Sequence, residues 1–423
     1  MKKNNSSRIL LISSASLTKG PGAIAMNIYD ALCEQGCEVD VLTLYQESAF
    51  PKAEYIYKKE SCIKNFIFRV YRKLRKQPKD GYYFFYKKEN YPPVSSSKVL
   101  RHIKKSYDAV VIFFWQGLLS FETVDKLYDK LKCKFFFVCA DFSPMSGGCH
   151  FTNECQQFMT GCGCCPAFNS NDPNDFTHWN VMYRQKVYDK VKPVLIANHY
   201  MIDNFFKKSF LLKDCTFLLL KNIINHQMFK PLDRNPLYKK FQIPQEKEYI
   251  IAFGCQSLLD ERKGMSYLLD ALDLVHQQLT IEERRKTLLL FIGNNGEQII
   301  PRLKLDYKNL GFIPINELPA FYSISTLFIC SSVNDAGPSM VAQALACGTP
   351  VIAFQMGAAL DLVKGQGTGY CAELRNSADL AKGVLDILRM DAEAYIKLRI
   401  HCSEISREQS SKKAFAELVL SAM

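Results

Sequence analysis

The stretch LFICSSVNDAGPSMVAQALACGTPVIAF, at Leu327–Phe354, decides the fold. An apolar run that ends at Cys330 is typical of a buried β-strand, and a polar loop at residues 331–337 follows it. Pro338 then occupies the position of a first helical residue, where its missing N–H costs nothing and its φ angle is already helical. A short helix follows, and Gly348 is expected to end it in the left-handed conformation before the next apolar strand begins.

This strand–loop–helix unit predicts where a ligand binds. The loop lies at the carboxyl end of one strand and beside the N-terminus of a helix, which is where ligands bind in open α/β sheets. The dipole and the free N–H groups of a helix N-terminus favour an anion there. The sequence therefore predicts an anion-binding loop at residues 331–337.

The same stretch resembles the retaining glycosyltransferases of the GT-B, family 4 group, also called glycosyltransferase group 1. That family carries two Glu residues separated by seven residues, and a Cys-Gly-Thr-Pro-Val tail follows them. Asp335 and Gln343 stand at the two acidic positions here, and the tail is intact at residues 347–351. The alternative is an ordinary strand–helix corner in some other doubly wound protein.

The chain alternates between predicted strands and helices throughout, which indicates an α/β fold with parallel sheets. The resemblance implies the GT-B architecture, in which two doubly wound Rossmann-like domains face a cleft. The segment KNIINHQMFKPLD, at Lys221–Asp233, resembles the family's inter-domain segment. We therefore expect an acceptor-side domain at residues 1–230, a donor domain at residues 231–405, and a C-terminal helix at residues 406–423 that packs back on the first domain.

The formal net charge of +12 on these 423 residues is concentrated in one segment. Residues 58–105 hold fifteen Lys and Arg against three acids. Within them, residues 61–77 have the spacing of an amphipathic helix with a basic face. There are three alternatives for this face: it faces solvent without a partner, it docks on anionic lipid headgroups, or it contacts nucleic acid. No recognition motif accompanies it, so no nucleic-acid partner is expected.

No apolar run reaches the roughly 18 residues that a membrane-spanning helix needs, so no span is expected. The N-terminal residues are too polar for a secretory signal. We expect a cytoplasmic protein, with peripheral attachment to the inner face of a membrane as a hypothesis for the basic helix.

The resemblance also implies how the donor is held. GT-A enzymes bind the donor diphosphate through a metal on an Asp-x-Asp motif, and this chain has no such motif. GT-B enzymes use cationic side chains and a helix N-terminus instead, so catalysis is expected to need no metal and no other cofactor. Lys263 matches a family Lys that precedes a Gly, and we expect Lys263 and its neighbour Arg262 to grip the diphosphate. Cys255 stands where the family has an Arg, and a solvated charged turn is the alternative for residues 262–263.

Asp335 is expected to accept hydrogen bonds from sugar hydroxyls, while Gln343 stands where a family Glu bonds the ribose diol. A Gly-rich first turn around Gly22 resembles the family loop that approaches the donor or the acceptor. The donor-binding residues implied by the resemblance are Gly22, Gly254, Gly337, Pro338, Ser339, Met340 and Gln343.

The first half of the chain departs from the family at Phe114 and Ala140, where many members have His. In the front-face reaction described for the family, the leaving phosphate takes the acceptor proton, so the missing His does not exclude catalysis. Asp141 is the nearest remaining polar candidate. The expected catalytic residues are therefore Asp335, Lys263, Arg262 and Asp141.

Sixteen Cys residues without a signal peptide indicate reduced thiols or a metal site. Five of them fall within residues 149–165, in a segment with no helical or strand period, which four soft ligands on one zinc ion would order. A similar block occurs in a subset of polysaccharide-assembly glycosyltransferases. The expected ligands of this structural zinc are Cys149, Cys155, Cys162 and Cys165, with Cys164 as an extra member and His150 as a substitute ligand. Free thiols and disulfides are the alternatives.

These observations favour a metal-independent, retaining glycosyltransferase of the hexosyltransferase type. It would move a sugar from a nucleotide-sugar donor to a glycan or lipid-linked acceptor in surface or capsular polysaccharide synthesis. Two other classes stay open: a catalytically degenerate GT-B domain that binds a glycan or a partner, and a Cys-rich metal or redox protein on a Rossmann scaffold.

Overall fold

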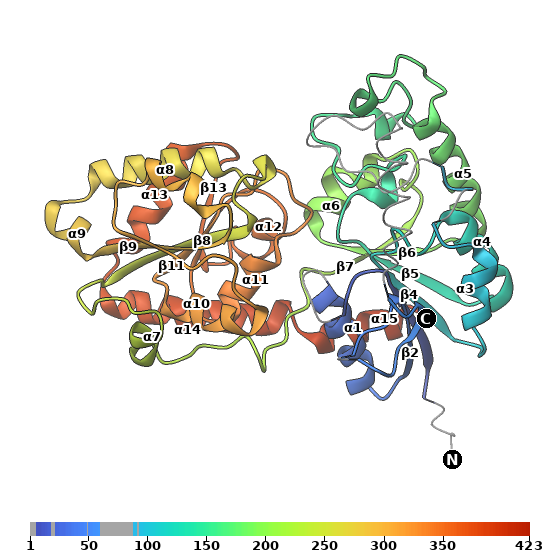
Figure 1. Ribbon diagram of the computed structural model, residues 1–423, viewed down its shortest axis with the longest axis horizontal. Coiled ribbons are helices and arrows are strands. Elements are labelled where there is room, and N and C mark those ends of the chain that lie inside the picture. The colour runs from blue at the N-terminus through green and yellow to red at the C-terminus, as the bar shows by residue number, and fades with distance from the viewer. Residues whose placement is uncertain (1–5, 18–21, 49, 60–87, 91–92) are drawn as a thin grey trace. The chain divides into compact units, whose positions relative to one another are not determined.

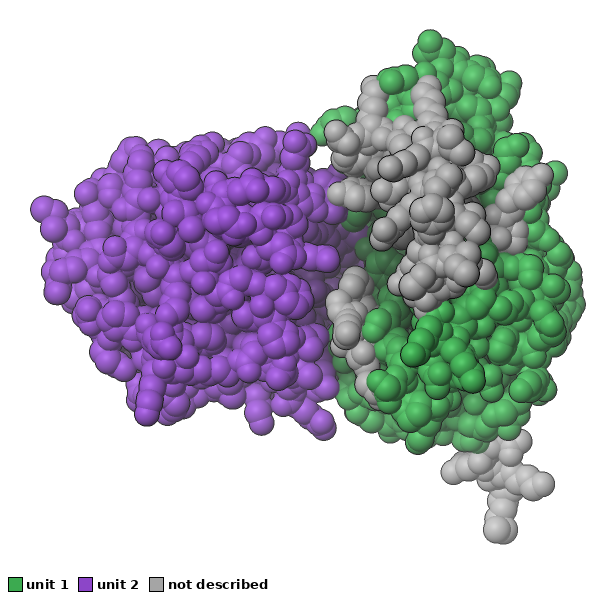
Figure 2. All heavy atoms as spheres, viewed as in Figure 1, with its two compact units in different colours: residues 1–197, 201–220, 412–423 green, residues 198–200, 221–411 purple. Residues whose placement is uncertain are grey.

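The computed structural model describes residues 6–17, 22–48, 50–59, 88–90 and 93–423. They form two compact units (Figure 2). Unit 1 comprises residues 1–197, 201–220 and 412–423, and unit 2 comprises residues 198–200 and 221–411. The chain therefore passes from unit 1 to unit 2 after Leu220 and returns to unit 1 with its last helix, whereas the sequence pattern suggests boundaries near residues 231 and 406.

Unit 1 is built on a sheet of seven parallel strands in the order β3-β2-β1-β4-β5-β6-β7 (Figure 1). Its strands are β1 (Arg8–Ser13), β2 (Glu38–Tyr45), β3 (Glu54–Tyr57), β4 (Ala109–Phe113), β5 (Lys134–Val138), β6 (Val194–Ala197) and β7 (Thr216–Leu219). Its described helices are α1 (Gly22–Glu34), α3 (Ser96–His102), α4 (Phe121–Leu131), α5 (Phe176–Val191), α6 (His199–Asn204, which begins in unit 2) and α15 (Lys412–Ser421).

The central strands of unit 1 are apolar along their whole length. β4 reads AVVIF and is buried throughout, and β5 reads KFFFV and is buried after Lys134. Such runs are typical of parallel strands that are covered on both faces. Parallel neighbours also need crossover connections, and α4 and α5 supply those that follow β4 and β5.

The last helix belongs to unit 1, where α15 packs against α1. Lys412, at the start of α15, forms ion pairs with Glu34 and Asp30 on α1. The C-terminus of the chain is thereby attached to the first crossover helix of unit 1.

Unit 2 is built on a sheet of six parallel strands in the order β10-β9-β8-β11-β12-β13. Its strands are β8 (Tyr249–Ser257), β9 (Thr287–Asn294), β10 (Tyr307–Asn309), β11 (Leu327–Cys330), β12 (Val351–Phe354) and β13 (Gly369–Ala372). Its helices are α7 (Asn235–Lys240), α8 (Met265–Gln278), α9 (Ile281–Lys286), α10 (Leu318–Ile324), α11 (Ser339–Ala346), α12 (Ala358–Leu362), α13 (Ser377–Leu388) and α14 (Ala392–Gln409). Helices α8 and α13 cover one face of the sheet, and α10, α11 and α14 cover the other (Figure 1).

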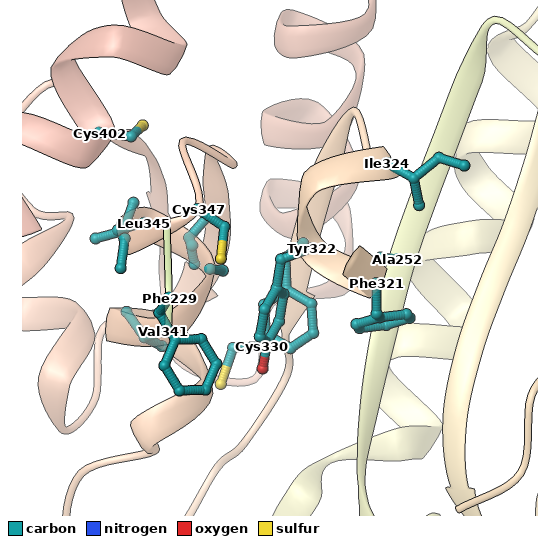
Figure 3. Close-up of a cluster of buried hydrophobic side chains, with 14 of the residues drawn as sticks. Phe229, Ala252, Phe321, Tyr322, Ile324, Cys330, Val341, Leu345, Cys347 and Cys402 are labelled. Atoms are coloured by element: carbon teal, nitrogen blue, oxygen red, sulfur yellow. The ribbon is translucent and has the colours of Figure 1, made fainter. Parts of the chain in front are cut away.

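The deciding stretch folds as expected, since β11, α11 and β12 form the predicted strand–helix–strand unit. Val341 and Leu345 of α11 lie in one buried cluster with Tyr322 and Phe229 (Figure 3). The left-handed end of α11 is confirmed, because Gly348 has a φ of 70°. One detail is wrong: α11 begins at Ser339, and Pro338 precedes it with an extended ψ of 112°.

Other elements differ from what the sequence pattern predicts. The edge strand β3 is only partly apolar, and the pattern predicts no strand there. The apolar run at residues 108–115 predicts a strand up to Trp115, but β4 ends at Phe113, because Phe114 adopts a φ of 48°. The pattern also predicts a strand at residues 309–312, but β10 ends at Asn309. The basic helix expected at 61–77 lies outside the described residues. Among the residues that the structure describes, no helix is long and apolar enough to cross a membrane.

Candidate functional site

Two loops of unit 2 meet at the carboxyl ends of β8 and β11. Lys263 lies on the loop that follows β8, and Asp335 lies on the loop that follows β11. The Lys263 Nζ donates to Asp335 Oδ2 at 2.5 Å, and the other oxygen of Asp335 accepts from the backbone N–H of Gly337 at 3.1 Å. Two residues expected at the donor site are thus brought together directly before the N-terminus of α11.

The two loops approach so closely because residue 264 is a glycine. Gly264 has a φ of +63°, and a Cβ there would lie 2.1 Å from the carbonyl oxygen of Ser331. The Ser331 Oγ donates to the carbonyl of Lys263 at 2.8 Å, and the backbone N–H of Val333 donates to the carbonyl of Arg262 at 2.8 Å. A side chain at position 264 would separate the loops that carry Lys263 and Asp335.

Lys263 remains a cation at neutral pH. Burial lowers the pKa of Lys263, but the adjacent Asp335 carboxylate raises it by charge and by hydrogen bonding, and the net direction is upward. The side chains of Lys263 and Asp335 are 23% and 13% exposed, so this ion pair is reachable from solvent. A partly buried, ionised lysine beside a helix N-terminus is suited to hold a phosphate group.

Arg262 has a different environment from Lys263. Its guanidinium pairs with Asp260 at 2.5 Å, and Asp260 also accepts from the backbone N–H of Arg262. Arg262 therefore pairs with an acid of its own turn, whereas Lys263 pairs with an acid of the neighbouring loop.

Gly254 and Cys255 lie in the last part of β8. A Cβ at Gly254 would lie 2.4 Å from a side-chain carbon of Ile292 and 2.6 Å from its carbonyl oxygen, so the neighbouring strand β9 requires a glycine there. The Cys255 thiol donates to the carbonyl of Ser257 at 3.0 Å. Gly254 is thus required for the packing of β8 against β9. Cys255, which stands where the family has an Arg, has a small side chain that bonds within its own strand.

Gln343 lies one turn into α11, and its side-chain oxygen accepts from the hydroxyl of Tyr322 at 3.1 Å. Tyr322 is fully buried, so this contact fixes the orientation of the amide. The sequence does not indicate a role for Tyr322, because this residue lies on α10, outside any recognised motif. The oxygen expected to meet a ribose hydroxyl therefore already has a protein donor.

The remaining expected donor residues lie around the start of α11. Ser339 and Met340 open the helix, directly after Pro338. A Cβ at Gly337 would lie 2.7 Å from Nδ2 of Asn198, which belongs to unit 2 and donates to the carbonyl of Ala336 at 2.6 Å. Asn198 is a further residue at this loop that no sequence motif indicates. In the Gly-rich turn expected near the N-terminus, Gly22 is the first residue of α1. The residues directly before Gly22 lie outside the described part of the chain.

In unit 1, Asp141 follows β5 and is almost fully buried in a polar cluster. Its Oδ1 accepts from the N–H of Ser143 at 2.8 Å and from the hydroxyl of Ser143 at 2.5 Å. Its Oδ2 lies 2.7 Å from His150 Nδ1 and 3.4 Å from Gln116 Nε2. Burial raises the pKa of Asp141, but His150 and Ser143 lower it and prevail, so Asp141 is a carboxylate.

His150 and Gln116 are therefore polar partners of Asp141 that the sequence does not reveal. His150 reaches it within an irregular segment that has no periodic pattern, and Gln116 reaches it from the end of another strand. The buried Oε1 of Gln116 and the indole N–H of Trp115 have no hydrogen-bond partner among the described residues. A histidine from the cysteine-containing segment thus contacts Asp141, whereas Phe114 and Ala140 are the positions where many family members have His.

The four cysteines expected to bind zinc line one pocket in unit 1. Its lining includes Cys149, Cys155, Cys162 and Cys165 but neither Cys164 nor His150. Burial raises the pKa of Cys149 to about 12 and that of Cys165 to about 11. In the described part of the chain, no group of three or more His, Cys, Asp or Glu residues is arranged to hold a metal ion.

Comparison with known proteins finds a family match over part of the chain. Residues 233–409 match the family Glycosyl transferases group 1. An uncharacterized glycosyltransferase of Haemophilus influenzae is 27% identical over 111 residues, which cover 26% of this chain and 31% of that protein.

Solved structures share the fold at low sequence identity. Sucrose-phosphate synthase from Thermosynechococcus elongatus aligns with a TM-score of 0.67 at 15% identity, over 98% of both chains. HepE from Anabaena, solved in complex with UDP-glucose, aligns with a TM-score of 0.63 at 14% identity, over 99% of this chain and 100% of its own. The fold expected from the sequence is confirmed: the chain has the GT-B fold, and its residues 233–409 match the family Glycosyl transferases group 1.

Proposed function

We propose that the chain is a retaining, metal-independent glycosyltransferase that moves a hexosyl group from a nucleotide-sugar donor to a glycan or lipid-linked acceptor. The observation that carries this proposal is the contact of Lys263 with Asp335 directly before the N-terminus of α11. The family match over residues 233–409 supports it, as does a bound UDP-glucose in the structure of HepE. We assign the reaction to surface or capsular polysaccharide synthesis on the resemblance alone.

The donor diphosphate would meet two positive features in unit 2. Lys263 supplies a full charge, and the start of α11 supplies N–H groups and the positive end of a helix dipole. Both features are in place before the donor binds, so they stabilise the charge that grows on the leaving diphosphate without further rearrangement. Lys263 would exchange part of its contact with Asp335 for a phosphate oxygen, which frees an Asp335 oxygen to accept from a sugar hydroxyl.

The nucleoside would lie near Gln343, but its contact with Gln343 would differ from its contact with a family Glu. Since Tyr322 donates to the amide oxygen, the side-chain NH₂ is the group that Gln343 can offer to a ribose oxygen. A family Glu would offer a charged acceptor at the same place. We therefore expect a weaker hold on the ribose diol than a Glu would give.

The acceptor side would be provided by the cluster around Asp141. A carboxylate with oriented His150 and Gln116 partners can bind a sugar hydroxyl, and the buried Oε1 of Gln116 is a further acceptor. In a front-face reaction the leaving phosphate takes the proton of that hydroxyl, so Asp141 would position the acceptor and need not remove its proton.

A catalytically degenerate GT-B protein is the second candidate. The replaced acids at Asp335 and Gln343, and the engagement of Gln343 by Tyr322, favour it. Docking to an anionic membrane surface is proposed from the basic sequence at 61–77 alone.

A melting-temperature screen against nucleotide sugars tests the proposal, because a ligand that binds the native state raises its stability by mass action. We expect one donor class to raise the melting temperature without added Mg²⁺ or Mn²⁺, and slow release of free sugar to follow. Binding without sugar release or transfer would favour the degenerate protein, and no binding by any donor would contradict both.

A further inference from the structure

The segment between β5 and α5, residues 139–175, has little regular structure. Three single 3-10 turns occur in it, η1 (Ser143–Met145), η2 (Gln157–Met159) and η3 (Pro166–Phe168). One small hydrophobic cluster in it consists of Cys165, Ala167 and Phe168, with the partly buried Phe176 packed against it. A structureless segment this long is uncommon inside a compact domain, so it needs another source of order.

Four thiols from this segment converge on one pocket. Cys149, Cys155, Cys162 and Cys165 all line it, whereas Cys164 does not. No charged side chain is among the lining residues, which otherwise present backbone, small polar groups and apolar carbon. Such surroundings suit a soft cation held by thiolates and do not suit an anion or a hard cation that prefers carboxylates.

The backbone is shaped to bring these thiols together. Residues 161–164 all have positive φ angles, 98°, 59°, 93° and 44° in order, and two of them are cysteines for which this conformation is unfavourable. A Cβ at Gly163 would lie 2.1 Å from the carbonyl oxygen of Pro173, so the tight turn depends on that glycine. The turn brings Cys162 and Cys165, separated by two residues, to the same pocket.

We propose that Cys149, Cys155, Cys162 and Cys165 bind one zinc ion in a closed, tetrahedral site. Among the residues that the structure describes, no group of three or more His, Cys, Asp or Glu side chains is arranged to hold a metal ion, so the four thiols must move toward a common point in the pocket for zinc to bind. Each thiol gives up its proton to solvent as its sulfur bonds the metal. Four protein ligands leave no open position, so the zinc stabilises the segment and takes no part in the sugar chemistry.

The site also has a consequence for unit 1. Cys149 directly precedes His150, whose Nδ1 bonds Asp141. An ion that fixes Cys149 therefore also fixes the histidine against the carboxylate at the end of β5.

Metal analysis of the full-length protein tests the proposal. The protein is purified under reducing conditions without added zinc and without a histidine tag. We expect about one zinc per chain in the wild type and in Cys164→Ser, and a loss of most of it in Cys155→Ser. Cys155 and Cys164 are both partly exposed, so the two substitutions disturb folding to a similar extent. Equal zinc contents in the two variants would overturn the four-cysteine assignment.

A measurement on the wild type avoids substitutions altogether. Cobalt added to metal-free, reduced protein should give the intense visible absorption of tetrahedral thiolate coordination, and stoichiometric zinc should abolish it. Far less than one zinc per chain together with no such absorption would overturn the proposal. Two disulfides among these cysteines, found by mass spectrometry in metal-free native protein, would overturn it as well.

Discussion

The donor loop of unit 2, residues 331–338, and the cysteine segment of unit 1, residues 139–175, both follow a buried parallel strand. They are held in place differently. The donor loop joins β11 to α11, and apolar side chains of both lie in the buried cluster of Figure 3. The cysteine segment is held by α5, whose side chains donate to its backbone. These bonds run from Asn180 to the carbonyl of Gly147, from Arg184 to those of Ser143 and Ser146, and from Tyr188 to that of Pro144.

The difference shows what each region can do. A short loop on an apolar core can expose a charged pair to a ligand, because the core supplies the stability. A long segment without its own core must be fixed by buried polar contacts and, as we propose, by a metal ion. Substitutions in the two regions should therefore fail in different ways, the first in activity and the second in folding.

The largest effect is expected at Arg184. Its guanidinium is 2% exposed and pairs at 2.5 Å with Glu89, which is fully buried. Arg184→Met would leave that carboxylate without its cation, which should destabilise unit 1 by about 3–5 kcal/mol. Urea unfolding followed by tryptophan fluorescence measures this, because Trp115 and Trp179 both lie in unit 1.

Lys190→Met is the matched control on the same helix. Lys190 pairs with Asp125 and Asp129 but is 38% exposed, so its loss should cost less than about 1 kcal/mol. Equal destabilisation by the two substitutions would contradict the account of how the cysteine segment is held.

A smaller loss of stability is expected at Gly264. Gly264→Ala adds a Cβ against Ser331 at a positive φ, which should cost about 2–4 kcal/mol and separate the loops of Lys263 and Asp335. Gly311 has a φ of +64° with no atom within 4 Å of an added Cβ, so Gly311→Ala should cost only about 1–2 kcal/mol. Urea unfolding followed by circular dichroism compares the stability of the two variants, and hydrogen exchange of residues 331–337 compares the order of the loop. Equal stability and equal exchange in both variants would contradict the close approach of the two loops at Gly264.

Asp335→Asn should change activity with little change in folding. The amide keeps an acceptor for Gly337 but loses the charge beside Lys263, and we expect transfer to slow about tenfold to a hundredfold. Binding of the nucleoside diphosphate should stay equal or tighten, because the phosphate no longer competes with a carboxylate for Lys263. Asp270→Asn, at an exposed ion pair with Arg302, serves as the control. A loss of diphosphate binding in Asp335→Asn would contradict the competition described here.

The smallest effect is expected at Gln343. Gln343→Glu offers one oxygen to Tyr322 and a second, charged oxygen to the ribose, so donor affinity should rise roughly fivefold, about 1 kcal/mol. In a Tyr322→Phe background the gain should shrink, since Gln343 then regains its own oxygen as an acceptor. Calorimetric titration measures both, and an unchanged affinity would place Gln343 outside the nucleoside site.

Local patterns account for most of what the sequence predicts. Strands buried on both faces, as in β4, and the Gly348 helix end follow from residues close together in the chain. Lys263 and Asp335 are each expected at the donor site, where ligands bind at the carboxyl ends of parallel strands, but their ion pair is not expected from the sequence.

What the sequence misses depends on contacts between distant residues. His150 reaches Asp141, Tyr322 reaches Gln343, and Asn198 reaches the carbonyl before Gly337, each without a motif. Arg262 and Asp260 are close in the chain, but the sequence does not predict the turn that directs the Arg262 side chain toward Asp260. The tertiary structure decides these partners.

The central claim is that Lys263 holds the diphosphate of the donor, and one titration tests it most directly. Wild type and Lys263→Ala are titrated calorimetrically, without added Mg²⁺ or Mn²⁺, with UDP, GDP and dTDP. Lys286→Ala serves as a control because that lysine pairs with Glu248 at the surface. We predict that one nucleotide binds the wild type and Lys286→Ala equally, and binds Lys263→Ala at least about tenfold more weakly, a loss of about 1.4 kcal/mol. Equal affinity of Lys263→Ala and the wild type for that nucleotide would contradict the account.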